Sequence, residues 1–275
     1  MFQLHSGNEI LNIDQPLVMG VINCTPDSFY TGSRATSQDQ AKKMVEKMVN
    51  EGADIIDIGG RSSRPGSVEI SDEEEIERIS EVISFIVKEF SSTWISIDTT
   101  KSTVAKYAVE LGCKIINDIS GGEMDKDMIR TVSNLNVPFI CMHMQGTPDH
   151  MQNNPHYENV TEDVSTYFES KLELLKTNGI KNVVIDPGFG FGKSIDHNYT
   201  LMRDLKQFKK FEKPILVGIS RKSMIYKLLG VTPEESLNGT NALNMYALMN
   251  GANILRVHDV KAAKEVVNIY QQLYK

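Results

Sequence analysis

The sequence contains little cysteine, and its three cysteines follow no known pattern. Cys24, Cys113 and Cys141 are widely spaced, odd in number and include no C-x-x-C pair. A disulfide framework and a zinc site are therefore not expected. Cys113 and Cys141 lie within apolar runs, which predicts that they pack in a hydrophobic core.

The sequence also lacks long apolar runs and an excess of positive charge. No apolar stretch reaches membrane-spanning length, and the N-terminal segment lacks the charged start and apolar core of a signal peptide. We therefore expect a cytoplasmic protein without a membrane partner. The formal net charge of -7 argues against a nucleic-acid partner, which would require clustered Lys and Arg. An anionic small molecule remains possible, because a few local cations can outweigh a distant negative surface.

Short apolar runs recur along the 275 residues, which are enough for one α/β barrel or two small domains. Most of these runs are apolar almost throughout, which favours strands that are covered on both faces. The eight runs are LVMGVI (17–22), DIIDI (54–58), WISID (94–98), CKIIND (113–118), PFICMH (138–143), NVVID (182–186), PILVGI (214–219) and ANILRV (252–257).

Helical patterns lie between the apolar runs, for example at 38–49, 72–90, 161–177 and 260–273. Strands that alternate with helices predict a parallel sheet, either a doubly wound sheet or a closed barrel. Eight repeats without a break in composition favour a single (β/α)8 TIM barrel domain over residues 1–275. Residues 2–14 precede the first repeat, and we expect an N-terminal β-hairpin there, over the bottom of the barrel.

A polar residue closes every predicted strand, at the end where barrel enzymes carry their active sites. Any one of these residues can be a turn former or a helix cap, and Asp259 before the last helix is predicted to be such a cap. Eight polar ends in phase indicate a polar site. The strand-end residues are Asn23, Asp57, Asp98, Asn117 with Asp118, His143, Asp186, Ser220 to Lys222, and Arg256 with His258.

One group of polar residues has the chemistry of an anion site. Arg64 and Arg256 can make planar, bidentate contacts with phosphate oxygens. His258 lies just before the last helix, where backbone N–H groups also attract anions. Together with Asn23 they predict a diphosphate site, although exposed arginines are common and Arg64 alone would carry little weight.

A second group has the chemistry of a site for a flat heterocycle. Asp98, Asn117, Asp186 and Lys222 supply two carboxylates, an amide and an ammonium, which match a ring with both donors and acceptors. The alternative is a structural ion pair between Asp186 and Lys222 that fills the barrel mouth.

The stretch DPGFGFGKS (186–194) is not a phosphate-binding loop. G-x-x-x-x-G-K-S would need glycine at the position of Pro187, and G-x-G-x-x-G would need glycine at the position of Lys193. We interpret it as a tight turn whose glycines let the backbone approach a ligand, with Phe189 and Phe191 as pocket walls. The alternative is a connector whose aromatic side chains fill the core.

Taken together, eight blocks of the sequence resemble dihydropteroate synthases, in order and from about residue 17 to residue 270. Each block alone would be a weak signal, but eight collinear blocks are specific. The blocks are MGVINCTPDSFYTG, GADIIDIGGRSSRPG, ISIDTTKSTVAKYAVELG, IINDISGG, CMHMQGTPDHMQ, VVIDPGFGFGKS, LVGISRKSMI and GANILRVHDV.

This resemblance implies an enzyme that joins 6-hydroxymethyl-7,8-dihydropterin diphosphate to 4-aminobenzoate and releases diphosphate, with Mg²⁺ as cofactor and a homodimer as its assembly. It implies roles in pterin binding for Asp98, Asn117, Asp186 and Lys222. It implies diphosphate contacts for Ser63, Arg64, Arg256 and His258, and for Asn23, which would also contact the magnesium ion. It implies an aminobenzoate pocket formed by Phe29, Pro65, Phe191, Lys222 and Ser223. The catalytic residues would be Asp98, Lys222, Arg64, Arg256 and His258.

The second loop departs from the family pattern, which often reads GGxSTRPG with an acidic residue at x. This chain has Arg61 at that position and Ser63 where the family has threonine. Neither change removes an implied ligand, but the fine contacts of the loop cannot be carried over from the family.

Two other functions remain open from the sequence. A methyltetrahydrofolate-binding methyltransferase would share the barrel and the pterin contacts but would hold no diphosphate, so Arg64, Arg256 and His258 argue against it. A non-catalytic pterin-binding barrel would not need the intact set of Arg64, Lys222 and His258. For the synthase, the sequence offers several cations for a leaving group and no obvious general base, which predicts a dissociative displacement at the pterin methylene.

Overall fold

Strands and helices alternate along the computed structural model, which describes residues 1–25, 34–61, 69–147, 151 and 155–274. The strands are β1 (Phe2–Ser6), β2 (Glu9–Ile13), β3 (Leu17–Asn23), β4 (Ile55–Gly59), β5 (Trp94–Asp98), β6 (Ile115–Asp118), β7 (Phe139–Met142), β8 (Val183–Asp186), β9 (Leu216–Val217) and β10 (Ile254–Val257). The helices are α1 (Arg34–Asn50), α2 (Asp72–Glu89), α3 (Ser102–Leu111), α4 (Met128–Leu135), α5 (Val160–Thr177), α6 (Ile195–Arg203), α7 (Ser223–Leu229), α8 (Leu237–Met249) and α9 (Val260–Leu273), with short 3₁₀ turns η2 (Leu205–Phe211) and η3 (Glu234–Ser236).

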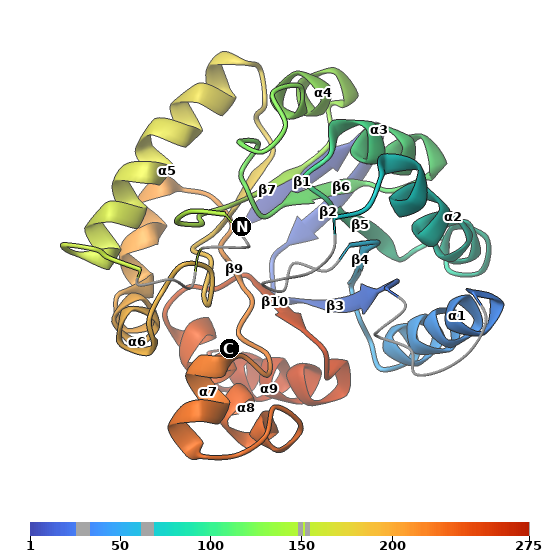
Figure 1. Ribbon diagram of the computed structural model, residues 1–275. Coiled ribbons are helices and arrows are strands. Elements are labelled where there is room, and N and C mark those ends of the chain that lie inside the picture. Colours follow the sequence, from blue (N-terminus) through green and yellow to red (C-terminus); the bar gives the residue numbers. More distant parts are fainter. Residues whose placement is uncertain (26–33, 62–68, 148–150, 152–154, 275) are drawn as a thin grey trace.

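The strands β3 to β10 form a parallel sheet that curls into a barrel, in the order β8-β7-β6-β5-β4-β3-β10-β9. A single bridge between Ile185 and Ile215 brings β8 next to β9 and nearly closes the ring. The helices surround this ring (Figure 1). The predicted (β/α)8 TIM barrel is confirmed, and each of the eight predicted apolar runs overlaps one strand of the barrel.

The N-terminal hairpin is also confirmed, because β1 and β2 pair in antiparallel register from Phe2 opposite Ile13 to Ser6 opposite Glu9. It closes one end of the barrel. Leu4 and Ile13 of the hairpin belong to the same buried cluster as the inward-facing side chains at the starts of the strands. These side chains are Leu17, Met19, Ile55, Trp94, Ile115, Ile140, Val184, Leu216 and Ile254.

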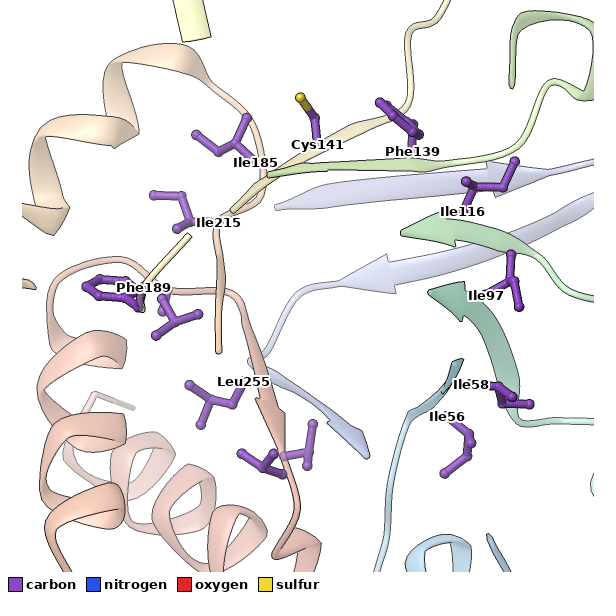
Figure 2. Packing of buried hydrophobic residues seen from close by; sticks show 14 of the residues in the cluster. Ile56, Ile58, Ile97, Ile116, Phe139, Cys141, Ile185, Phe189, Ile215 and Leu255 are labelled. Carbon is purple, nitrogen blue, oxygen red and sulfur yellow. The ribbon is translucent and has the colours of Figure 1, made fainter. Parts of the chain in front are cut away.

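Successive side chains of a strand alternate between the barrel interior and the helices, as strand geometry requires. In β4, Ile55 belongs to the interior cluster, whereas Ile56 and Ile58 belong to the cluster that faces the helices (Figure 2). Asp57 therefore points inward, two residues above Ile55. The same alternation turns the polar ends of β5, β6, β8 and β10 toward the interior, so the barrel is apolar at its N-terminal end and polar at its C-terminal end.

The helices cover the outer face of the sheet with apolar stripes. In α2, Ile79, Val82, Ile83 and Ile86 are fully buried in the outer cluster. The helix begins after Ser71, whose hydroxyl accepts a hydrogen bond from the Glu74 N–H, and its first turn is acidic, which suits the positive end of the helix dipole. No helix in the described part of the chain is long and apolar enough to cross a membrane.

Candidate active site

The C-terminal ends of the strands gather most of the side chains that the sequence singled out. Phe29, Ser63, Arg64 and Pro65 lie outside the described residues. The others lie at the barrel mouth, on or directly after the strands, except Phe191 in the turn after β8, Lys222 at the N-cap of α7 and Ser223 at the first position of α7. They are Asn23, Asp98, Asn117, Asp186, Phe191, Lys222, Ser223, Arg256 and His258.

Arg256 connects the two predicted groups of residues at the centre of the mouth. Its Nε donates to Asp57 Oδ2 at 2.7 Å, and its Nη2 donates to Asp98 Oδ2 at 2.6 Å. Asn117 Nδ2 donates to the same oxygen of Asp57 at 3.0 Å. Among the described residues Arg256 Nη1 has no acceptor, so this end of the guanidinium can receive an anion.

Asn23 and Asp98 lie on either side of Gly59, the last residue of β4. A Cβ atom added to Gly59 would be 3.7 Å from Asn23 Oδ1 and 3.6 Å from Asp98 Cβ. The absence of a side chain at Gly59 therefore keeps a space between an amide oxygen and a carboxylate. These are hard oxygen donors, the kind that Mg²⁺ prefers.

Lys222 reaches the same interior from the start of α7. A Cβ atom on Gly218 would be 3.7 Å from Arg256 Cβ and 4.0 Å from Lys222 Nζ, so both side chains pass close to this glycine. Lys222 does not form the ion pair with Asp186 that was one interpretation of the sequence. Its ammonium instead donates to Phe189 O at 2.5 Å and lies 4.6 Å from the centre of the Phe191 ring.

Asp186 ends β8 with its carboxylate nearly buried, at 7% exposure. One oxygen, Oδ1, accepts the backbone N–H of Gly188 at 2.8 Å, which fixes the carboxylate. The described residues provide no donor to Oδ2. A buried carboxylate with one oxygen in reserve can accept from the N–H edge of a heterocycle.

The two phenylalanines of the turn after β8 have different surroundings. Phe189 is fully buried in the core between sheet and helices, so the prediction that it lines a pocket is wrong for this ring (Figure 2). Phe191 is partly exposed at the mouth under Lys222, as a pocket wall would be. A Cβ atom on Gly188 would be 1.9 Å from His143 O, so this position, with φ of 71°, requires glycine.

Two polar contacts join the loop after β9 to the loop after β10. Ser220 Oγ lies 3.1 Å from His258 Nδ1 and accepts the His258 backbone N–H at 3.2 Å. Arg221 binds both carboxylate oxygens of Asp259, at 2.9 and 2.7 Å. Asp259 does occupy the N-cap position of α9, but its side chain makes no capping hydrogen bond, because both oxygens are held by the arginine.

Burial controls the titration of the charged groups in the mouth. It raises the pKa of Asp98 to about 7, an effect that Arg256 opposes and Asp57 reinforces. It lowers the pKa of Lys222 to about 8, although Asp186 opposes the change. It also raises the pKa of Asp186, with Lys222 acting in the opposite direction. Asp98 and Lys222 thus have pKa values close to neutral pH.

Two features of the site were not assigned from the sequence. Asp57 was recognised as a polar strand end but not as the buried partner of Arg256. Its signal was a carboxylate one residue before the end of an apolar run. Lys193 was considered only as a failed phosphate-loop lysine, whereas its ammonium is buried and lies 3.0 Å from His143 Nδ1.

The mouth combines two kinds of recognition in one polar layer. Asp186, Asn117 and Lys222 can match a flat ring that has both donors and acceptors. Arg256, His258 and Asn23 can hold an anion, alone or with a cation. A substrate that carries a flat heterocycle at one end and an anionic group at the other suits this arrangement.

The comparison with family models agrees with this geometry. Residues 19–258 match the model described as pterin binding enzyme. The match covers most of the chain and includes all the strand ends described above. The chain therefore belongs to the family of pterin binding enzymes.

Proteins similar to this chain over nearly its whole length include several dihydropteroate synthases. The chain is 41% identical to the dihydropteroate synthase of Haemophilus influenzae over 271 residues, with 98% of both chains covered. It is 43% identical to that of Escherichia coli K12, with 95% of this chain and 93% of the relative covered. Among solved structures, a Yersinia pestis dihydropteroate synthase with a sulfonamide drug complex has a TM-score of 0.93, 38% identity and 99% coverage of both chains. A Xanthomonas albilineans dihydropteroate synthase with 4-aminobenzoic acid has a TM-score of 0.92 and 36% identity, with 99% of this chain and 98% of that chain covered.

Proposed function

We propose that this chain is a dihydropteroate synthase and that residues 1–275 act as one pterin-binding barrel domain. It condenses 6-hydroxymethyl-7,8-dihydropterin diphosphate with 4-aminobenzoate to give 7,8-dihydropteroate and diphosphate. The observation that carries the proposal is the contact of Arg256 with Asp98 and Asp57, because it places an anion-binding cation directly beside the carboxylates and amide of the heterocycle site.

The experiment that tests this function is a two-substrate assay. The purified chain should release diphosphate and form dihydropteroate in equal amounts, and only when both substrates are present. A methyltransferase would instead consume methyltetrahydrofolate, and a non-catalytic barrel would bind the pterin without releasing diphosphate. Either of those results would replace the proposed reaction.

The heterocycle site binds the pterin. Asp186 Oδ2 accepts from the ring's guanidine-like edge, Asn117 binds a neighbouring ring atom, and Lys222 donates to an acceptor of the ring. Asp98 lies toward the methylene end, where it is paired with Arg256 at 2.6 Å in the free protein.

Asp186→Asn should weaken binding of the pterin diphosphate by about 2 kcal/mol, roughly 30-fold, because it removes a charge-assisted acceptor from a buried site. Isothermal calorimetry with the pterin substrate measures the change. Asn182→Asp alters a half-buried residue just before β8, at the opposite end of the strand from Asp186, and should leave the affinity within about 2-fold. Unchanged affinity in Asp186→Asn would remove this carboxylate from the site.

The anion site binds the diphosphate. Arg256 Nη1 and His258 contact its oxygens, and Ser63 and Arg64 add contacts from the second loop. A magnesium ion fits the donors present, since Mg²⁺ often takes only one or two protein ligands and completes its shell with water and substrate phosphates. Asn23 Oδ1 would hold it beside the diphosphate, and the ion would offset negative charge on the leaving group.

The aminobenzoate pocket lies above the pterin, with Phe191, Lys222 and Ser223 on one side. Phe29 and Pro65 belong to the same loops as the anion ligands Asn23 and Arg64. These loops therefore connect the two binding events. Neither Lys222, which is held by Phe189 O, nor Ser223 has an imidazole or carboxylate positioned to make it a base. The arylamine is already neutral at pH 7, and the pocket needs only to position it.

Because the loops are shared, aminobenzoate should bind at least about 10-fold more tightly when magnesium diphosphate is present, and the coupling must be reciprocal. Equilibrium titration of aminobenzoate with and without magnesium diphosphate measures the effect. Magnesium sulfate at the same ionic strength is the control. Equal affinities in the two titrations would show that the two sites are independent.

The chemical step separates charge before the new bond forms. The carbon–oxygen bond to diphosphate breaks, its electron pair leaves with the diphosphate, and the pterin methylene becomes cationic. Arg256 and His258 stabilise the leaving group, and the Asp98 carboxylate stabilises the cation. The amine then forms the carbon–nitrogen bond and loses its proton to solvent.

We also propose a homodimer formed by α7 and α8. These neighbouring helices expose large apolar side chains, with Leu228 at 61%, Leu229 at 52% and Met249 at 55% exposure. A second copy of the chain would cover them, which is the usual role of such a surface. The double variant Leu228→Glu, Met249→Glu should sediment as a monomer at about 10 µM, where the unaltered chain is a dimer. An unaltered chain that sediments as a monomer would contradict the proposal.

A further inference from the structure

Lys193 is a buried cation to which the reaction gives no role. It is 3% exposed, and its ammonium forms no ion pair with any carboxylate of the described residues. It donates instead to the carbonyl oxygens of Gly188 at 2.9 Å and Phe191 at 3.1 Å, and it lies 3.0 Å from His143 Nδ1. Burial lowers the pKa of Lys193 to about 7, although the nearby Asp186 carboxylate opposes this change, and these hydrogen bonds stabilise the charged form.

The two carbonyl oxygens belong to the turn that carries Phe191. This turn contains Gly188, Gly190 and Gly192, all at positive φ. Glycines of this kind have wide conformational freedom, so the sequence of the turn does not by itself fix its shape. Lys193 contacts both ends of the segment 188–191 and can fix it.

The turn is also held from the opposite side. Lys222 Nζ donates to the carbonyl oxygen of Phe189, which lies in sequence between the two carbonyl groups that Lys193 binds, and it lies 4.6 Å from the centre of the Phe191 ring. Carbonyl groups of one short turn thus bind two different ammonium groups. The Phe189 ring anchors the turn in the core, and the Phe191 ring is left at the mouth.

His143 connects this turn to the end of β7. Burial and the nearby Lys193 lower the pKa of His143 to about 2, so the ring is neutral and its Nδ1 can accept from the ammonium. From the adjoining loop, Tyr157 donates its hydroxyl to Gly192 O at 2.8 Å. The turn is thereby fixed to two elements that have no contact with substrate in the proposed reaction.

We propose that Lys193 is a positioning residue for the arylamine substrate: its ammonium holds the 188–191 turn against His143 so that the Phe191 ring forms one wall of the pocket beside Lys222. This inference rests on the proposed function, in which Phe191 borders the aminobenzoate. Without the ammonium, the glycine-rich turn gains freedom and the ring no longer has a fixed place. The pterin site changes less, because Asp186 keeps its own hydrogen bond from Gly188.

The test compares Lys193→Met with Lys171→Met. Methionine retains the length of the side chain and removes its charge and donors. Lys171 is a matched control, since it is 7% exposed but pairs with Glu123 at 2.7 Å away from the turn. In Lys193→Met, KM for aminobenzoate should rise by about 10- to 100-fold, the scale for a misplaced substrate contact. The Kd of the pterin diphosphate should change by less than about 3-fold, and Lys171→Met should leave both constants near those of the unaltered chain.

A double-mutant cycle shows whether Lys193 acts through the ring. Phe191→Ala should raise KM for aminobenzoate by itself, and adding Lys193→Met to it should have little further effect, because the two changes remove the same wall. A lysine that only stabilises the fold would give additive effects. If Lys193→Met does not fold, Lys193→Gln, which keeps one donor group, gives the same measurements.

Three results would overturn the proposal: an unchanged KM for aminobenzoate in a folded Lys193 variant, equal weakening of both substrates, or additive effects in the cycle. Failure of the proposed function would look different. In that case the unaltered chain would not form dihydropteroate at all, and none of the variant comparisons would begin from an active enzyme.

Discussion

Replacing Asp98 with asparagine should lower kcat by about 100- to 1000-fold, the usual loss when one group that stabilises transition-state charge is removed. Asparagine keeps the size of the side chain and can still contact the pterin, but it cannot neutralise a methylene cation. The Kd of the pterin diphosphate should therefore change far less than kcat does. This pattern identifies a contact that strengthens in the transition state.

The pH dependence of kcat/KM is a second test of the role of Asp98. Burial raises the pKa of Asp98 to about 7, and the carboxylate must be ionised to stabilise a cation. For the unaltered chain, kcat/KM should thus fall as the pH is lowered through about 7, because the free enzyme becomes protonated at this residue. In Asp98→Asn this inflection should be absent.

Asp54→Asn is the matched control for Asp98. Asp54 is also held by a cation, Lys264 at 2.6 Å, but it lies at the N-terminal end of the barrel. The kcat of Asp54→Asn should stay within about 2-fold of the kcat of the unaltered chain. If Asp98→Asn retains full kcat with an unchanged pH profile, Asp98 does not stabilise charge in the reaction.

Replacing Arg256 with methionine should lower the free energy of unfolding by about 3–5 kcal/mol, because it leaves two carboxylates without their partner in a buried layer. Asp57 is fully buried and the side chain of Asp98 is 17% exposed, so water cannot replace the guanidinium well. Diphosphate affinity should fall in the same variant, since Arg256 is the central cation of the anion site.

Urea unfolding at pH 5 and pH 8 tests whether the lower free energy of unfolding comes from the unpaired carboxylates. Protonation relieves an unpaired carboxylate, so the destabilisation of Arg256→Met should be smaller at the lower pH. The double variant Arg256→Met, Asp57→Asn should recover part of the stability. Lys264→Met removes a cation of similar exposure from a more exposed carboxylate, since Asp54 is 24% exposed and Asp57 is fully buried, and it should cost less than about 1 kcal/mol. A loss in Arg256→Met no larger than in Lys264→Met would contradict the bridging role.

The barrel could be predicted from the sequence because both faces of its strands are buried, so that each strand is a short apolar run. Each strand of the ring lies within a predicted apolar run or extends one residue beyond it, and helices α2, α5 and α9 begin and end within one residue of the predicted ranges. The hairpin was predicted at residues 2–14 because they precede the first repeat. These features depend on local composition and spacing, which the sequence contains directly.

The contacts inside the mouth could not be predicted, because they depend on which strand positions face inward. A run such as DIIDI does not reveal that Asp57 and Ile55 point to the interior until the ring is closed. Asp57 meets Arg256 across 199 positions of sequence. Asp259 could be recognised as a helix-cap position, but not as the partner of Arg221, since that ion pair joins two different loops.

The turn after β8 shows the same limit on a smaller scale. The sequence predicted a tight, glycine-rich turn with aromatic side chains near a ligand, and the Phe191 ring lies at the mouth, 4.6 Å from Lys222 Nζ. It did not separate Phe191 from Phe189, which fills the core. The difference arises because Lys193 and Lys222 bind different carbonyl groups of the turn, and both contacts depend on the folded loops.

In the proposed reaction, Asp98 stabilises the pterin methylene cation and Arg256 stabilises the departing diphosphate. Varying the nucleophile tests this charge separation most directly. Turnover is measured with a series of substituted 4-aminobenzoates of increasing amine basicity, after single-turnover kinetics have confirmed that the chemical step limits kcat. If the carbon–oxygen bond breaks before the amine attacks, kcat should be nearly independent of basicity across the series. A steep rise of kcat with amine basicity would show that the amine attacks as the diphosphate leaves, and it would contradict a pterin cation stabilised by Asp98.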